Sequence, residues 1–509
     1  MGILSPHAIG DDTPHCAANH GSSSDAVLYG LRPRFATVIF GAGQRREAPP
    51  QARFSATGNR DTQMAPHRIE RNRHRLIVTF LAAATLLTSA TLGTATSGQV
   101  FDGKPDQVLE WNQVFIDTLI ATNTANAASQ RLGAIVHTAI FDAYNGIERR
   151  YTPVFVHDAA PPGASRRAAV VAAAYTALVR LFPTRESQLR KTYEASLAAL
   201  SDDDEDGGRS RERGIRWGSQ VAEAVLAWRQ SDSAPEPPFY GNTAVGQWRM
   251  TANCNQQVGM TALSLASTGM FVLDSNRQFQ PAPPRTLLSE TYIADFDAVR
   301  MLGRATGSSR TDDQTTLAPF WEGNASVHWN QAANQIAHAN HSSMSGNNRL
   351  LAQLNLVMAD TAFTIWRAKR DFGGDPIEVT WRPWTAILLA DTDGNGATVP
   401  DAEWRPLVAT PCHPEYPAGH PAQNGAAARV LLSHFADAQR FTLTTRIVVM
   451  GVPVDLEPRT YESISQARAD GNDARVWGGM HYPSTVAISD GVGAAIAGYV
   501  DAKAMRRIR

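Results

Sequence analysis

From about residue 100 onward, apolar side chains recur every three or four positions over most of this 509-residue chain. That spacing is typical of amphipathic helices, and few segments alternate as half-buried strands would. Alanine, the strongest helix former, is abundant in the same segments. We predict helices over residues 108–122, 127–147, 166–181, 185–200, 214–229, 286–302, 311–320, 329–339 and 349–369. Helices of this kind bury their apolar faces against one another, so the predicted fold is an all-α helical bundle.

Three other segments read as connections. The acidic run 201–208 is most simply a solvated loop rather than a metal site. A stretch dense in Pro, Gly, Asn and Gln over 233–284 is predicted to be irregular and to pack over the surface between helical halves. Residues 391–396 resemble the start of a calcium loop, but Ala402 stands where the last ligand would be a glutamate. A tight Asx and glycine turn is the better interpretation.

Composition narrows the function classes. The length exceeds one small domain but does not choose between one large unit and several. Lys and Arg number 47 against 48 Asp and Glu, so no basic field is available for a nucleic acid. The three cysteines, Cys16, Cys254 and Cys412, are too widely spaced for a zinc site and too few for a disulfide scaffold. At most, Cys254 and Cys412 form one bridge in an oxidising compartment.

The N-terminal part divides into two segments. Residues 1–63 lack apolar periodicity and are predicted to be disordered or an over-extended start. Residues 64–97 run from a basic stretch through an apolar centre at 76–87 to small residues, the layout of an export signal. That centre is shorter than the roughly 20 residues of a spanning helix, although an N-terminal core helix or anchor stays an alternative. We therefore expect an exported, periplasmic or secreted protein without a permanent membrane span, whose helical domain covers 98–509.

Two histidines and an arginine stand in short glycine-containing segments near the C-terminus. Gly419 and His420 follow Pro417 and Ala418, and His481 comes six residues after Arg475. Each histidine stands one or two residues before a proline that opens an apolar stretch, which suggests a helix start. A helix start presents free N–H groups and a positive dipole end to an anion.

Two further cations lie upstream. Lys369 projects from the same helix face as Trp366, and Arg382 follows in Trp381-Arg382-Pro383. Taken alone, Lys369 reads as a solvated helix-end lysine and Arg382 as the partner of a carboxylate. Together with Arg475, the Gly419 amide and two converging helix starts, they predict a pocket for a phosphate-like oxyanion.

These motifs resemble those of the vanadium-dependent haloperoxidase and type 2 phosphatidic acid phosphatase (PAP2) superfamily, in particular its exported bacterial branch. The similarity runs from about residue 105 to 500 and includes 108–112, 161–164 and 381–387. It implies the helical bundle of that superfamily and vanadate as cofactor. Hydrogen peroxide, a halide and a small organic substrate would be the reaction partners, and an oligomer is possible.

The resemblance also implies a role for each candidate residue. His481 would bond vanadium, or attack phosphorus as a nucleophile. His420 would be the acid–base group. The oxyanion oxygens would be held by Lys369, Arg382, Arg475 and the N–H of Gly419.

Several positions depart from the family pattern. Ala418 and Ala474 stand where serines are usual, and Thr485 replaces an aspartate that would orient His481. An insertion within 370–381 separates Lys369 from Arg382, which leaves open whether the lysine reaches the site.

His413 and Trp366 are the candidates for a halide pocket. A histidine at position 413 favours bromide or iodide over chloride by the same resemblance, and the plain alternative is a loop histidine bonded to a neighbouring carbonyl. Trp366 equally fits a core position. Three functions therefore remain: a vanadate-dependent haloperoxidase, a metal-free acid phosphatase working through a phosphohistidine, and a degenerate oxyanion-binding protein.

Overall fold

The computed structural model describes residues 106–200, 208–372, 378–449 and 451–508. The predicted disordered segment 1–63 and export signal 64–97 lie outside these residues, as does nearly all of the acidic run. No helix among the described residues has the length and apolar character needed to cross a membrane.

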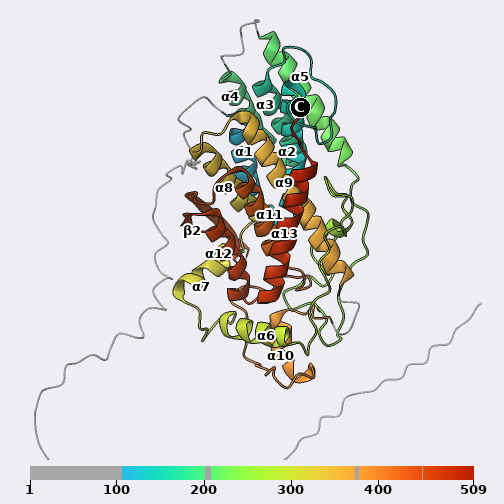
Figure 1. Cartoon of the computed structure of the whole chain (residues 1–509), viewed down its shortest axis with the longest axis vertical. Helices are drawn as coiled ribbons and strands as arrows, with labels where there is room; N and C mark the ends of the chain where they lie inside the picture. Colours follow the sequence, from blue (N-terminus) through green and yellow to red (C-terminus); the bar gives the residue numbers. More distant parts are fainter. Residues whose placement is uncertain (1–105, 201–207, 373–377, 450, 509) are drawn as a thin grey trace, which may run out of the picture. The chain divides into compact units, whose positions relative to one another are not determined.

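The described chain is a helical bundle with one hairpin, in agreement with the predicted fold class (Figure 1). Each predicted helix is present, with ends shifted by five residues at most. The α-helices are α1 (Gln107–Ala121), α2 (Asn126–Glu148), α3 (Arg166–Leu181), α4 (Glu186–Ala198), α5 (Arg209–Trp228), α6 (Glu290–Leu302), α7 (Asp312–Phe320), α8 (Ala325–Ala339), α9 (Met344–Asp371), α10 (Pro383–Leu388), α11 (Gly419–His434), α12 (Ile464–Trp477) and α13 (Pro483–Lys503).

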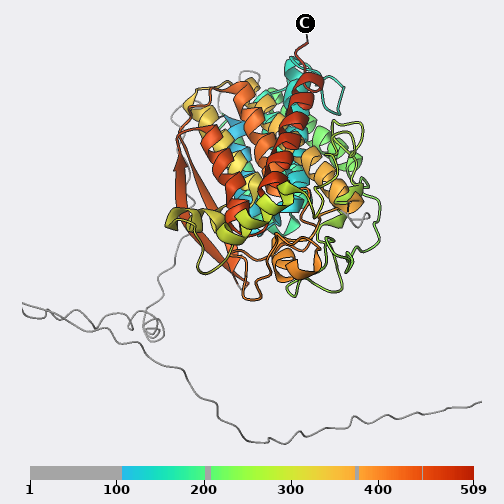
Figure 2. The ribbon, with the colours of Figure 1, turned by 60° about the horizontal axis from the view of Figure 1, so that its bottom comes forward.

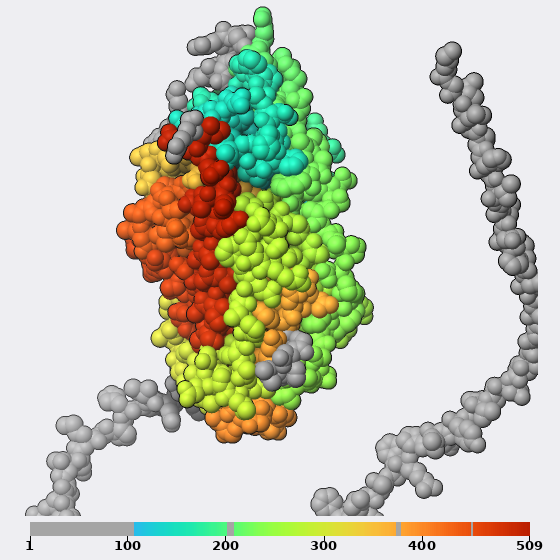
Figure 3. All heavy atoms as spheres, turned by 45° about the vertical axis from the view of Figure 1, so that its right-hand side comes forward, coloured from blue at the N-terminus to red at the C-terminus, as the bar shows by residue number. Residues whose placement is uncertain are grey.

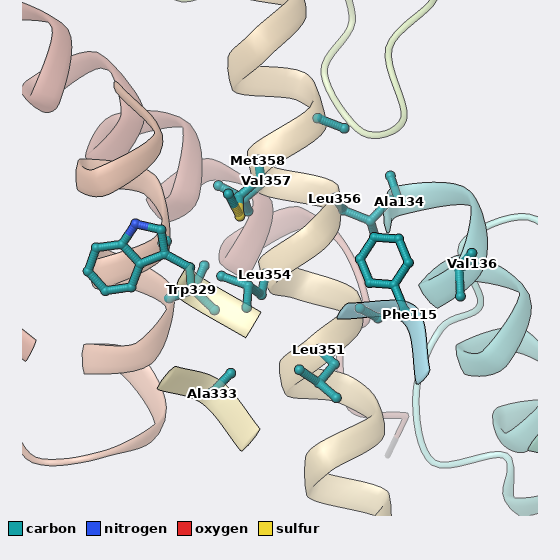
Figure 4. Packing of buried hydrophobic residues seen from close by; sticks show 14 of the residues in the cluster. Phe115, Ala134, Val136, Trp329, Ala333, Leu351, Leu354, Leu356, Val357 and Met358 are labelled. Atoms are coloured by element: carbon teal, nitrogen blue, oxygen red, sulfur yellow. The ribbon is translucent and has the colours of Figure 1, made fainter. Parts of the chain in front are cut away.

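Helix α9 is at the centre of the core. It packs against α2 on one side and α11 and α13 on another, and most of its residues are buried. In Figure 4, Leu356 of α9 lies beside Phe115 of α1 and Ala134 of α2, whereas Leu354 lies on the side of Trp329 of α8. Because α9 is buried on several faces, its polar residues also lie inside the protein and are hydrogen-bonded there, as Asn355 is to Asn330.

Helices α11 and α13 approach each other very closely. A Cβ added at Gly493 of α13 would lie 1.9 Å from the carbonyl oxygen of Ala422 in α11. Glycine is therefore required at this crossing. The crossing matters for function because both helices begin at the candidate site.

A β-hairpin was not predicted. β1 (Phe441–Val449) and β2 (Val452–Tyr461) pair antiparallel, with Phe441 opposite Tyr461, and β1 packs on α8 at the edge of the bundle (Figure 2). Phe441, Leu443 and Thr445 are buried, which is the expected alternation for a half-covered strand. β2 is mostly exposed, and Pro453 and Pro458 interrupt the alternating Val452, Val454 and Leu456, which argues against a strand from sequence alone.

The predicted irregular stretch 233–284 is indeed largely without regular structure apart from η3 (Leu263–Ser267). Figure 3 shows yellow-green atoms of this part of the chain beside the exposed, dark red C-terminal helix. The carboxylate of Asp360 in α9 holds the stretch by accepting the backbone N–H groups of Phe271, Val272 and Leu273 at 2.7–3.0 Å. A disulfide between Cys254 and Cys412 joins it to the segment that precedes α11.

The segment 391–396 forms a turn. The N–H of Asn395 donates to Asp393 Oδ1 at 2.8 Å, and Thr398 Oγ1 donates to Asp393 Oδ2 at 2.7 Å. The Asp393 carboxylate is thus used as an Asx-turn acceptor, as the sequence indicated.

Candidate active site

The candidate residues come from four segments that meet at one end of α9, α11 and α12. Arg475 lies in the last turn of α12, and the tight turn that follows brings His481 back, since the N–H groups of Met480 and His481 both donate to the Arg475 carbonyl. Arg382 is the N-cap residue of α10, and its Nη1 lies 3.1 Å from Nε2 of His481. Residues a hundred positions apart in sequence are therefore in direct contact.

A hollow of about 370 Å³ opens at this meeting point. It is lined by six of the predicted site residues: Trp366, His413, Gly419, His420, Arg475 and His481. Arg382 and Lys369 lie just behind the lining. Arg382 Nη2 donates to Nδ1 of His413 at 2.9 Å, and its Nη1 also donates to the Met480 carbonyl at 2.8 Å.

Lys369 is in the cluster despite the insertion that follows it. It is fully buried at the end of α9, and its Nζ donates to the carbonyls of Pro414 at 2.6 Å and Glu415 at 3.3 Å. The interpretation as a solvated helix-end lysine is wrong, although Lys369 itself does not line the hollow.

Only one of the two predicted helix starts faces the hollow, which corrects the sequence-based expectation. At the start of α11, the N-cap residue Ala418 provides no side-chain acceptor, and Gly419 lines the hollow. At the start of α13, the N–H of Tyr482 donates to Glu415 at 3.2 Å and that of Ser484 to Asp295 at 2.9 Å. Protein carboxylates, rather than a ligand, therefore occupy the positive end of α13.

Glu415 is a site residue that the sequence analysis missed. Its fully buried Oε1 lies 3.1 Å from Nδ1 of His481. His481 therefore has a carboxylate partner although position 485 is a threonine. The Thr485 hydroxyl donates to the other oxygen of Glu415 at 3.0 Å. Arg285, which is ion-paired with Asp295 at 2.8 Å, lies 3.6 Å from that same oxygen. The carboxylate expected at position 485 is thus supplied from position 415.

A signal for Glu415 was present but not decisive. It is an isolated carboxylate among the prolines, cysteine and aromatic residue of the segment 411–417. A charge in such an apolar setting is buried only when paired. Which histidine it pairs with depends on the turn after α12, which the sequence alone does not specify.

The hydrogen bonds of His481 define its tautomer. Arg382 is always a donor, so Nε2 of His481 accepts from it and the ring proton is on Nδ1, where it donates to Glu415. Burial, followed by the charges of Arg382 and Lys369, lowers the pKa of His481 well below its usual value. Burial conversely raises the pKa of Glu415, against the opposing effect of Arg285. The His481 ring is therefore neutral, and the lone pair of its Nε2 faces Arg382.

His420 makes its contacts at the start of α2 and the end of α7. Its Nε2 lies 3.2 Å from the carbonyl of Gly323 and 3.3 Å from Nδ2 of Asn126. The other amide atom of Asn126, Oδ1, accepts the N–H of Ala325, so the amide group faces His420. Burial and then Arg475 lower the pKa of His420, so that it is a neutral ring able to take up a proton.

His413 and Trp366 form one wall. Their ring centroids are 5.5 Å apart, and Trp366 lies against Gly419 while its indole N–H donates to the carbonyl of Thr261. Nδ1 of His413 lies 3.2 Å from the carbonyl of Pro414, the contact expected of a loop histidine, and 2.9 Å from Arg382 Nη2. Because Arg382 can only donate, Nδ1 accepts from it and the neutral ring carries its proton on Nε2. Burial and then Lys369 lower its pKa.

The charge of the cluster fits an oxyanion. Lys369, Arg382 and Arg475 are all buried, and their charges act on one another. Burial lowers the pKa of Arg382 to about 9, with Arg475 contributing in the same direction. Nε of Arg475 is buried without a hydrogen-bond partner, and Nη1 is paired with Glu322 at 2.8 Å. A bound anion would relieve this repulsion and satisfy the free donor.

This chain is similar to known proteins in part of its sequence and in its fold. Residues 349–509, which carry all the predicted site residues, match the family model of the VCPO second helical-bundle domain. A bacterial vanadium-dependent iodoperoxidase structure is similar with a TM-score of 0.64 and 20% identity, over 79% of this chain and 97% of that one. An apo bacterial vanadium-dependent chloroperoxidase gives 0.55 and 17%, over 74% and 92%. Its holo form gives 0.54 and 16%, over 74% and 91%. No curated protein matches the sequence.

Proposed function

We propose that this chain, which has the fold of the vanadium haloperoxidase family and its second helical-bundle domain, is a vanadate-dependent haloperoxidase that oxidises a halide with hydrogen peroxide. One observation carries the proposal. A neutral imidazole, His481, presents its Nε2 lone pair to buried cations while a carboxylate holds its Nδ1–H. This is the arrangement of a metal-ligating histidine oriented by a second residue.

The chain's own residues would share the work as follows. His481 would ligate vanadium through Nε2, the atom that lies 3.1 Å from Arg382 Nη1 in this structure. Arg382, Arg475, Lys369 and the N–H of Gly419 would neutralise the oxyanion charge. His420 would accept a proton from incoming peroxide and return one to the leaving oxygen. Bound vanadate would supply Lewis acidity, which makes the peroxide oxygen electrophilic toward halide.

Bromide or iodide is the proposed halide. His413 lines the hollow, and its Nε2–H is a donor suited to an anion, while Trp366 gives the same wall an apolar surface. Bromide and iodide are less strongly hydrated than chloride, so placing them against this wall costs less desolvation free energy. Arg382 donates to His413, so one side chain contacts both the proposed halide site and the proposed oxyanion site.

We also propose that the protein is exported. The segment 64–97 has the layout of an export signal. The Cys254–Cys412 disulfide is consistent with an oxidising compartment.

The test is reconstitution of the purified mature protein with orthovanadate, followed by measurement of bromide and iodide oxidation. We expect activity that requires both vanadate and peroxide and that is lost in His481→Ala. His420→Ala should lose turnover while retaining most of the vanadate affinity. Hydrolysis of a phosphate ester, inhibited by vanadate and without halide oxidation, would instead identify a phosphatase.

A further inference from the structure

A second hollow, of about 650 Å³, adjoins the candidate site. It shares the lining residues Asn126, Glu322 and Ala409 with the first hollow, so the two lie side by side. Gly323, whose carbonyl contacts His420, also lines it. We call this second hollow the hairpin chamber, because the distal part of β1 forms one of its walls.

The walls of the hairpin chamber are largely apolar. They come from four segments: residues 123–126 leading from α1 into α2, the end of α7 with residues 322–324 after it, residues 407–409, and β1. The apolar side chains include Pro319, Leu407, Val408, Ile447 and Val448. Val448 is 44% exposed, which leaves apolar surface uncovered at the entrance. A volume of this size is typical of sites for small organic ligands.

The charged groups of the chamber are already paired. Arg446 makes a bidentate ion pair with Asp455 across the hairpin at 2.6 and 2.7 Å, and Glu322 is paired with Arg475. Two of the three side-chain amides in the lining are also engaged, since Asn126 contacts Ala325 and His420, and Asn324 caps the start of α8. An occupant would therefore find apolar surface rather than an unpaired charge.

We propose that the hairpin chamber binds an uncharged, largely apolar organic molecule, such as an electron-rich aromatic ring, and holds it for halogenation. The inference rests on the proposed function, which supplies hypohalous acid in the adjoining hollow. In the transfer, a carbon–halogen bond forms as the halogen–oxygen bond breaks. The ring then loses a proton, which combines with the released hydroxide as water.

The first experiment measures binding and needs no catalytic activity. Indole, as an uncharged probe, is titrated into the vanadate-free protein by ligand-observed NMR. Val448→Trp should weaken indole binding by about fivefold or more, because the larger side chain occupies apolar surface that indole would otherwise cover. Val452→Trp is the matched control, since this residue is 60% exposed on the same hairpin and does not line the chamber.

Two binding results would overturn the proposal: no detectable binding of indole, or equal weakening by both tryptophan variants. Indole-3-acetate should bind less tightly than indole, because its carboxylate has no unpaired cation to meet. Equal or tighter binding of the acetate would contradict the assignment of an uncharged ligand.

The second experiment uses the active enzyme and compares bromoindole isomers with those from free hypobromous acid. The wild type should give a different isomer ratio, whereas Val448→Trp should shift toward that of the free reagent and keep its rate of iodide oxidation. A wild-type ratio identical to that of the free reagent would overturn halogenation in the chamber. An enzyme that binds indole but oxidises no halide would refute the proposed function and leave the binding result standing.

Discussion

Glu415 Oε1 lies 3.1 Å from Nδ1 of His481, although the two residues are separated by the whole of α11, the hairpin and α12. The carboxylate is anchored on its far side by Thr485 and Arg285. His481 is therefore held in one tautomer and one orientation by a group from the segment before α11. A residue with this role acts through His481 rather than on the substrate.

Glu415→Gln is expected to lower halide-oxidation turnover by about 10- to 100-fold, the usual effect of losing a partner that orients a metal-ligating histidine. The amide no longer stabilises the Nδ1–H tautomer. The pH–rate profile should also shift, because the charge facing His481 is lost. Glu403→Gln, at an exposed position, is the control. Turnover and pH profile both unchanged in Glu415→Gln would rule out a positioning role.

Ala418→Ser adds a hydroxyl at the N-cap of α11, next to Gly419. A hydrogen bond to a charged group is worth about 1.5 to 3 kcal/mol, so vanadate should bind at least about tenfold more tightly. Calorimetric titration measures this affinity. Ala428→Ser, further along the same helix, should leave it unchanged. Unaltered affinity in a folded Ala418→Ser protein would show that position 418 does not face the anion.

Removing the disulfide with Cys254→Ser and Cys412→Ser should destabilise the protein by about 5 kcal/mol from chain entropy alone, given the sequence separation of 158 between the cysteines. Because Cys412 lines the first hollow beside His413, the apparent KM for halide should rise as well. Denaturant unfolding and halide kinetics test the two effects. The wild type under reducing conditions should unfold like the double variant. Identical unfolding curves for the oxidised wild type and the double variant would contradict the expectation.

His328 links stability to pH. It is buried between Phe320 and Trp321 with Nε2 2.7 Å from the Thr445 hydroxyl, and burial lowers its pKa to about 3. The unfolded chain takes up a proton near pH 6.5, so the unfolded state is favoured as pH falls from 6.5 toward 3. Between pH 7 and 5, the stability gap between the wild type and His328→Gln should narrow by about 2 kcal/mol. Urea unfolding at both pH values measures the gap, and a constant gap would mean that the pKa of His328 is not lowered in the folded protein.

Sequence periodicity was sufficient for the helices because each buries a stripe of side chains with a regular spacing. It was not sufficient for β2, whose residues are mostly exposed. It was also not sufficient for α12, whose last turn buries the charged Arg475 in the site instead of an apolar side chain. The candidate site residues were recognisable by their motifs. Glu415 was not, because its role depends on the turn that returns His481 toward Arg475. The start of α13 was misassigned for a similar reason, since its partners Glu415 and Asp295 come from distant segments.

The most direct measurement is a crystal structure of the mature protein with bound vanadate. We expect vanadium bonded to Nε2 of His481, with its oxygens contacted by Arg382, Arg475 and the N–H of Gly419, and with Glu415 still bonded to Nδ1. Vanadate bound elsewhere, or held in this hollow without a bond to His481, would contradict the account.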